Sequence, residues 1–168
     1  MRCQRGDAER MTRLPEPAGI TEASSAISTS ASGRSGVPVR QTFSSGSAWE
    51  PVVGYSRAVR VGSAVFVAGT TAGGADGPVG GDDPAEQARE VLQRIAAALA
   101  QAGAELTDVV RTRIYLTRMS DFEAVGGVHG DVFSAVRPAT TVVEVAALAD
   151  PRLLVEIDVD AILASAGG

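Results

Sequence analysis

Lysine is absent from the sequence, so all fifteen positively charged side chains are arginines. No lysine amine is therefore available to form a Schiff base with a carbonyl substrate or with pyridoxal phosphate. The lone cysteine, Cys3, cannot form a disulfide within the chain or a thiolate metal site. The lone histidine, His129, cannot build a histidine zinc cluster. We expect no cofactor and no metal, and chemistry that rests on carboxylates, arginines, hydroxyls and backbone amides.

A basic stripe and a long apolar run are also missing. The 168 residues carry a net charge of −5, with an isoelectric point near 4.9. An acidic domain of this kind is poorly suited to holding phosphate backbones, which argues against nucleic acid as a partner. The apolar runs are far shorter than a membrane span, so we expect a soluble, cytoplasmic protein without membrane contact. Hydrophobic residues still make up 45% of the chain, enough for one domain with a substantial core.

The beginning of the chain differs in composition from the rest. Residues 21–36 are rich in serine, threonine, alanine and glycine, and Ile27 is their one large apolar side chain. Such a segment cannot bury enough surface to offset the entropy of ordering. The stretch before it lacks the apolar core of a signal peptide. We expect a disordered leader over 1–38, or a start site placed too far upstream, and a folded domain over 39–165.

Local patterns predict an α+β fold in which one sheet carries two helices on a single face. The expected strands are 39–43, 55–61, 64–68, 108–117, 140–146 and 153–161, and the expected helices are 85–102 and 121–134. Gly62–Ser63 reads as a two-residue hairpin loop. Asp83 and Pro84 are typical of a helix start, Gly103 of a helix end, and Ser120 of a second helix cap.

Alternation along the later strands predicts which side chains share a face. We assign charged, aromatic and aliphatic side chains to the sheet face that the helices leave bare: Arg111, Arg113, Tyr115, Thr140, Val142, Glu144, Glu156 and Asp158. Neighbouring opposite charges there can pair with each other. The mixture fits a subunit interface better than open water, so we expect a homo-oligomer with polar groups trapped in clefts between subunits.

Four segments of the chain resemble the Rid (YjgF/YER057c/UK114) family. They are GYSRAVRVGSAVFVAGT, DVVRTRIYLT, RPATTVVEV and LLVEIDVDAI, and the order of elements agrees from about Gly54 to Leu163. The resemblance implies a chorismate-mutase-like fold and a homotrimer whose three inter-subunit clefts bind small molecules. It also implies hydrolysis of reactive imines and enamines, chiefly 2-aminoacrylate and its relatives, to a 2-keto acid and ammonia.

The same resemblance assigns roles to individual residues. Tyr55 matches the family's cleft tyrosine, and Gly69 matches the glycine whose backbone amide meets the ligand. Val142 stands where a second backbone contact is made. Glu156 matches the carboxylate that positions the attacking water, which makes it the candidate catalytic residue.

One position departs from the family pattern. Active deaminases carry an arginine that holds the substrate carboxylate as a bidentate pair, and here that position is Thr140. A family asparagine likewise falls on Gly126. The chain therefore resembles a member outside the arginine-bearing subgroup.

Another arginine could replace the missing anchor. Strand parity puts Arg113 on the same predicted face as Thr140, and Arg137 lies just ahead of that strand. The alternative is that Arg111 and Arg113 form structural ion pairs with acidic residues across the sheet.

Two classes of function stay open. The first is a Rid-type enzyme that processes an imine, enamine or related metabolite through water positioned by Glu156, but not a standard 2-aminoacrylate deaminase. The second is a non-catalytic ligand-binding or structural trimer. A ribonuclease or translation inhibitor is less favoured, because the chain is acidic, lacks lysine, and places His129 on the apolar stripe of its helix.

Overall fold

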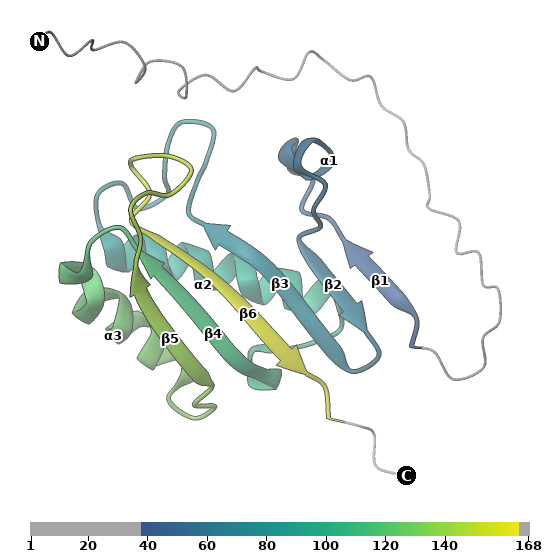
Figure 1. Cartoon of the computed structure of the whole chain (residues 1–168). Coiled ribbons are helices and arrows are strands. Elements are labelled where there is room, and N and C mark those ends of the chain that lie inside the picture. The colour runs from purple at the N-terminus through teal and green to yellow at the C-terminus, as the bar shows by residue number, and fades with distance from the viewer. Residues whose placement is uncertain (1–37, 165–168) are drawn as a thin grey trace, which may run out of the picture. The chain divides into compact units, whose positions relative to one another are not determined.

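A six-stranded sheet forms the centre of the fold in the computed structural model, which describes residues 38–164. The strands are β1 (Arg40–Phe43), β2 (Ala58–Val61), β3 (Ala64–Thr71), β4 (Val109–Leu116), β5 (Ala139–Glu144) and β6 (Val155–Ile162), and the helices are α1 (Trp49–Val53), α2 (Pro84–Gln101) and α3 (Phe122–Phe133). The strand order is β1-β2-β3-β6-β4-β5, with β4 and β5 parallel and the other neighbours antiparallel. Figure 1 shows α2 and α3 behind the sheet. The predicted α+β class, with these two helices on one face, is confirmed.

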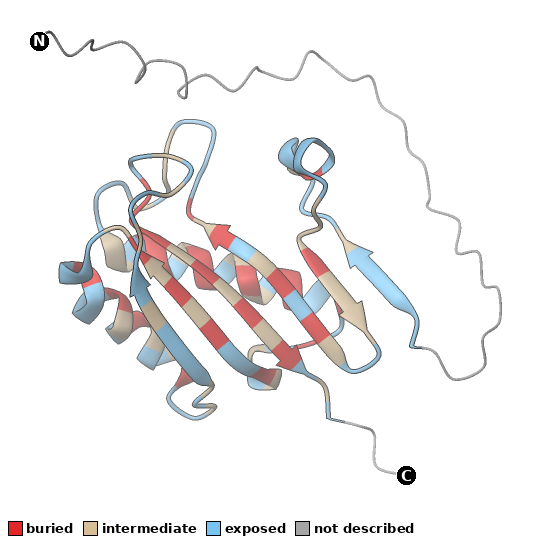
Figure 2. Ribbon diagram, in the orientation of Figure 1, coloured by how far each residue is buried: buried red, intermediate tan, exposed pale blue. Residues whose placement is uncertain are grey.

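The core lies between that sheet face and helices α2 and α3. Alternate residues of β6 are buried, as the sequence predicts, and Figure 2 shows the same alternation of buried and half-buried positions along the central strands. The larger buried side chains are Val65, Val67, Ile114, Leu116, Val155, Ile157 and Val159 from the sheet, and Val91, Leu92, Ile95, Leu99, Val125 and Phe133 from the helices. Each such side chain contributes roughly 1.5–3 kcal/mol by leaving water. This packing holds the helices against one face of the sheet and leaves the opposite face uncovered by helices.

The helix boundaries follow the sequence signals at α2 but not at α3. The Asp83 side chain accepts hydrogen bonds from the backbone amides of Ala85 at 2.8 Å and Glu86 at 3.2 Å. Gly103 ends the helix with a φ of 74°, a conformation that glycine adopts without strain. The predicted cap at Ser120 is wrong. Ser120 lies inside a 3-10 turn, Met119–Asp121, and α3 starts directly from that turn without a side-chain cap.

Two loop regions differ from the prediction in ways that affect the site. The segment before the first hairpin contains the short helix α1, held because the buried Glu50 carboxylate accepts hydrogen bonds from Ser45 N at 2.8 Å and Ser45 Oγ at 2.7 Å. Strand β3 continues to Thr71, so Gly69 belongs to the strand instead of the following loop. The leader expected before Val39 lies outside the described residues, apart from Pro38.

The face assigned to β5 is also wrong. In the parallel pairing with β4, Thr112 is the partner of Thr140 and Ile114 is the partner of Val142. Paired residues share a face, and Thr112 and Ile114 are both buried on the helix side. Thr140 and Val142 therefore lie on the helix-covered side of the sheet edge, opposite to Arg113, as does Glu144, the partner of the buried Leu116.

Helix α3 contains glycines whose replacement should stabilise the protein. A Cβ added at Gly127 or Gly130 would meet nothing within 4 Å, and neither residue has a positive φ. Glycine in a helix interior costs about 0.5–1 kcal/mol relative to alanine. We expect Gly127→Ala/Gly130→Ala to raise the free energy of unfolding by about 1–2 kcal/mol, measured by urea denaturation. An unchanged or lower free energy of unfolding would contradict this expectation.

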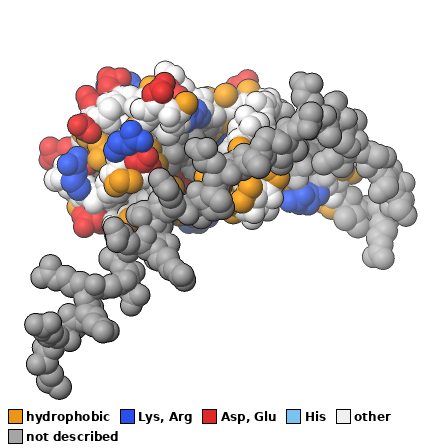
Figure 3. Space-filling model, turned by 90° about the horizontal axis from the view of Figure 1, so that it is seen from above, with side chains coloured by type: hydrophobic (Ala, Val, Ile, Leu, Met, Phe, Trp, Pro, Cys, Tyr) orange, Lys and Arg blue, Asp and Glu red, His pale blue; other side chains and the backbone are white. Residues whose placement is uncertain are grey.

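Charged side chains on the described surface are intermixed. At one end of the face in Figure 3, arginine side chains lie next to aspartate and glutamate side chains. Among the described residues, no helix combines the length and apolar character needed to cross a membrane.

Candidate active site

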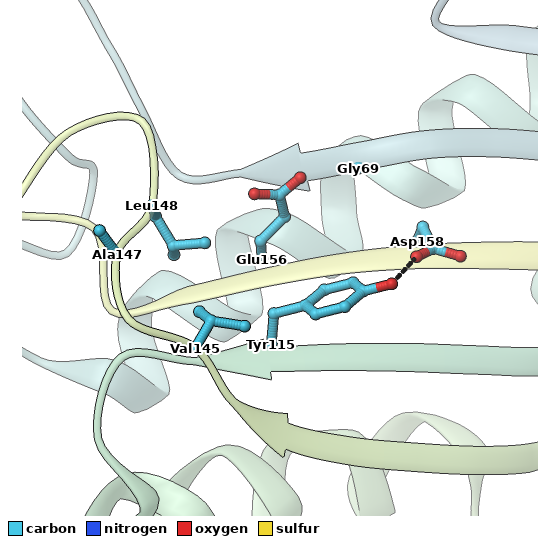
Figure 4. Close-up of a pocket in the computed structure, with 7 residues that line it drawn as sticks. All are labelled: Gly69, Tyr115, Val145, Ala147, Leu148, Glu156 and Asp158. Carbon is cyan, nitrogen blue, oxygen red and sulfur yellow. Dashed lines mark hydrogen bonds between the residues drawn. The ribbon is translucent and has the colours of Figure 1, made fainter. Parts of the chain in front are cut away.

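A shallow, open pocket of about 290 Å³ lies on the sheet face opposite the helices. Its floor and sides come from three neighbouring strands and from the loop between β5 and β6, as Figure 4 shows. The lining residues are Gly69 of β3, Tyr115 of β4, Val145, Ala147 and Leu148 of the loop, and Glu156 and Asp158 of β6. The pocket thus joins the two predicted site residues Gly69 and Glu156.

Gly69 leaves the space that the Glu156 carboxylate occupies. A Cβ at position 69 would lie 2.0 Å from Glu156 Oε1 and 3.0 Å from Glu156 Cδ, well inside van der Waals contact. Strands β3 and β6 change register between Val67 and Thr70, which puts Gly69 at this irregular point. A side chain at position 69 would therefore displace the Glu156 carboxylate, which extends across the neighbouring strand.

The surroundings of Glu156 disfavour its ionised form. Partial burial is the main cause that raises the pKa of the Glu156 carboxyl, and the negative charge of Asp158 adds to it, whereas Arg57 acts in the opposite direction. Figure 4 shows the carboxylate extending toward Gly69, and no hydrogen bond joins it to the other labelled residues. A carboxylate with a raised pKa and an open side is suited to accept a proton from water.

Tyr115 and Asp158 form a fixed polar pair beside Glu156. Tyr115 Oη donates a hydrogen bond to Asp158 Oδ2 at 3.0 Å. Partial burial and this bond raise the pKa of the Tyr115 hydroxyl, so it stays protonated at neutral pH. The phenol oxygen still has lone pairs that can accept a hydrogen bond from a ligand or water.

Arg113 is engaged in ion pairs on the same sheet face. Its Nη1 contacts Asp158 Oδ1, and its Nη2 lies 2.9 Å from Asp160 Oδ2. The neighbouring Arg111 Nε lies 3.8 Å from Asp160 Oδ2. Hydrogen bonds to the two aspartates raise the pKa of the Arg113 guanidinium. Arg111 and Arg113 therefore form structural ion pairs across the sheet, with Asp158 and Asp160 as partners, instead of standing free to bind a ligand.

Arg57 connects Tyr55 to the pocket, a role that the sequence analysis did not predict. Its Nη1 donates hydrogen bonds to Gly69 O and Thr70 Oγ1, each at 2.9 Å. Its guanidinium carbon lies 5.6 Å from the centre of the Tyr55 ring. Tyr55 itself does not line the pocket. The spacing in the sequence could have predicted this role, because Tyr55 and Arg57 are two residues apart at the start of an extended segment and so share a face.

Thr140 and Val142 lie away from this pocket. Thr140 Oγ1 lies 2.9 Å from Thr112 Oγ1 and donates a hydrogen bond to Pro138 O at 3.0 Å. Thr112 Oγ1 lies 3.1 Å from His129 Nε2, and burial lowers the pKa of the His129 imidazole. His129 therefore packs on the helix side and does not face Glu156.

Hydrogen bonds hold the pocket-forming loop against the core. The fully buried Gln87 side chain donates to Arg152 O at 3.0 Å and accepts from Leu154 N at 2.9 Å. At the other end of the loop, Val145 N donates to Leu116 O at 2.8 Å. The apolar wall of the pocket is thus anchored at both ends, although its position could not be predicted from local sequence.

Within residues 38–164, no group of three metal-ligating side chains gathers at this pocket or elsewhere.

Known proteins resemble the chain over almost all of the described domain. A family model described as endoribonuclease L-PSP matches residues 45–163. An uncharacterized protein of Streptomyces coelicolor is 42% identical over 117 residues, covering 70% of this chain and 87% of that protein. The rat protein named 2-iminobutanoate/2-iminopropanoate deaminase is 32% identical over 113 residues, covering 66% of this chain and 81% of the rat protein.

A solved structure agrees with the fold as well as with the sequence. A Mycobacterium tuberculosis protein described as a member of the YjgF/YER057c/UK114 family is 54% identical, with a TM-score of 0.69. The match covers 74% of this chain and all of that one. The family model over residues 45–163 and this 54% identical structure show that the chain belongs to the YjgF/YER057c/UK114 (Rid) family.

Proposed function

We propose that the chain is a hydrolase that cleaves the carbon–nitrogen double bond of a small imine or related metabolite. The observation that carries this proposal is the Glu156 carboxylate, which extends over Gly69 into an open pocket and has a raised pKa. A carboxylate in that state is a suitable base for a water molecule. The rat relative, named 2-iminobutanoate/2-iminopropanoate deaminase, supports the same class of reaction.

The proposed reaction needs no oxidant and no cofactor. Water oxygen adds to the carbon of a protonated imine, R₂C=NH₂⁺, while Glu156 accepts one water proton, which gives a neutral carbinolamine. The proton then passes from Glu156 to the amine nitrogen, the carbon–nitrogen bond breaks, and ammonia leaves. The remaining hydroxyl proton ends on ammonia, so the products are R₂C=O and NH₄⁺. Each step moves one proton over hydrogen-bond distance.

The residues around Glu156 have distinct parts in this reaction. Asp158 holds the Tyr115 hydroxyl so that the phenol oxygen can accept a hydrogen bond from the substrate nitrogen. Arg57 fixes the Gly69 carbonyl and thereby the irregular segment of β3 beside the carboxylate. The backbone amide of Gly69, as the family resemblance implies, is the donor for the developing oxygen.

We further propose that the site is completed in a homotrimer. The sheet face without helices exposes apolar side chains, with Phe66 at 48% and Val143 at 40% exposure. A partner on this face would cover them and would close the open side of the pocket. In that assembly the β5 edge with Thr140 and Val142 would reach the cleft of a neighbouring subunit.

The trimer has a direct test. Light scattering at micromolar concentration should give a mass of about 51 kDa, three times the 17.1 kDa of one chain. Dilution controls for nonspecific association, because a specific trimer should keep its mass over at least a tenfold range. A mass of one chain would contradict the trimer and the completed cleft.

Turnover tests the proposed reaction. An amine oxidase acting on isobutylamine generates an aliphatic imine, and the carbonyl product released above the uncatalysed rate measures hydrolysis. We expect the full chain to accelerate that release. If a ligand binds in the pocket and the release stays at the uncatalysed rate, the chain is a ligand-binding member of its family and the hydrolase proposal is wrong.

A further inference from the structure

Each arginine near the pocket already has partners in the protein. Arg113 pairs with Asp158 and Asp160, and Arg111 lies within 3.8 Å of Asp160. Arg57 directs its Nη1 to two backbone carbonyls and the Thr70 hydroxyl. A ligand carboxylate would have to compete with these bonds. None of the described residues that line the pocket is an arginine.

The lining instead combines carboxylates with an aliphatic wall. Glu156 and Asp158 lie side by side on β6, and the Tyr115 hydroxyl of β4 points to Asp158. The loop contributes Val145, Ala147 and Leu148. Asp158 is charge-matched by Arg113, so Glu156 is the carboxylate without a close cationic partner among the labelled neighbours. A second carboxylate brought into this space by a ligand would meet like charge.

The charges around Glu156 also favour a cationic ligand over an anionic one. The charged and titratable groups that face Glu156 are Asp158 on its own strand, Tyr115 on β4 and Arg57 beside β3. Burial together with Asp158 outweighs Arg57 and raises the pKa of Glu156. Burial only disfavours charge at this site, whereas the negative charge of Asp158 also attracts a small organic cation placed beside Glu156.

We propose that this pocket takes a positively charged aliphatic nitrogen compound that has no carboxylate, with the nitrogen between Glu156 and Tyr115 and the carbon chain against Leu148. For a substrate, this class is the protonated imine of a simple aliphatic amine. The proposal rests on the site of the proposed hydrolase and narrows its substrate. It disfavours 2-imino acids as substrates, because their carboxylate needs a cation that is not already paired.

Three probes of nearly the same shape test this preference: isobutylamine, isobutyramide and isobutyrate. Calorimetric titration of the full chain at pH 7.5 should give an affinity for isobutylammonium about tenfold or more above that for isobutyrate, with isobutyramide between them. Methyl resonances of Leu148 should shift with the amine. Because protonation removes the charge of Glu156, amine affinity should fall as the pH is lowered through the Glu156 pKa.

A variant pair locates the charge that selects the ligand. Glu156→Gln keeps the shape of the side chain and should lower amine affinity about tenfold, with little effect on isobutyramide. The control is Glu123→Gln, an exposed carboxylate in the first turn of α3. Tighter binding of isobutyrate, absence of saturable amine binding, or amine affinity unchanged by Glu156→Gln would each overturn the inference. Binding requires no turnover, so failure of the hydrolase proposal would appear separately as amine binding without imine hydrolysis.

Discussion

Replacing Glu156 with glutamine should lower kcat for imine hydrolysis by about 10²- to 10⁴-fold, the usual contribution of a positioned general base. Glutamine fills the space over Gly69 but cannot accept the water proton. The native rate should rise with pH as Glu156 ionises. Since partial burial raises the pKa of this carboxyl, the midpoint should lie above that of an exposed glutamate.

Stability separates this effect from misfolding. A raised pKa in the folded state means that protonated Glu156 favours the fold, and this contribution is lost as the pH rises through the folded pKa. Glu156→Gln should therefore melt at or above the native temperature at pH 8. Glu123→Gln serves as the matched control for kinetics, because that carboxylate is exposed on α3. Near-native turnover in Glu156→Gln would remove Glu156 from the mechanism.

Gly69→Ala should be nearly as damaging to turnover as the loss of Glu156 itself, with a decrease of about 10²-fold or more in kcat. The new Cβ would lie 2.0 Å from Glu156 Oε1, so the carboxylate would have to leave its position. The clash involves the end of a flexible side chain, and we expect the fold to persist. Kinetics and thermal melting of the same preparations would separate these outcomes.

A double-variant cycle tests whether Gly69→Ala acts through Glu156. If the alanine acts only by displacing Glu156, Gly69→Ala/Glu156→Ala should turn over no more slowly than Glu156→Ala alone. Gly127→Ala is the matched control, since a Cβ there meets nothing within 4 Å and the residue lies on α3. Additive losses would show that Gly69 has a role that does not pass through Glu156, such as its backbone amide.

Much of the fold could be predicted because alternation is strong where both neighbours of a strand exist. In β6 the apolar and acidic residues alternate strictly, and the buried set agrees with that pattern. In β4 the same holds for Thr112, Ile114 and Leu116 against Arg113 and Tyr115. The pairing of Arg113 with Asp158 then follows from the antiparallel register, in which the two residues are direct partners.

The edge strand and the pocket required tertiary information. Strand β5 carries threonine and valine on both faces, so alternation alone could not decide its orientation. The parallel pairing with the buried Thr112 decided it and turned Thr140 to the helix side. Likewise, Leu148 lines the same pocket as Glu156 because the loop is anchored at Leu116 and Gln87, and no local pattern encodes those distant contacts.

The central position of β6 has a consequence for biosynthesis. This strand lies between β3 and β4, yet it comes later in the chain than the strands on both its sides. While the ribosome is still making Val155–Ile162, the β1–β3 meander and the β4–β5 pair have no strand to join them. Their facing edges are open to pairing with other chains during that interval. Because Glu156 lies on β6, the pairing that closes these two edges also creates the pocket, so a nascent chain cannot form the site before β3 and β4 are joined.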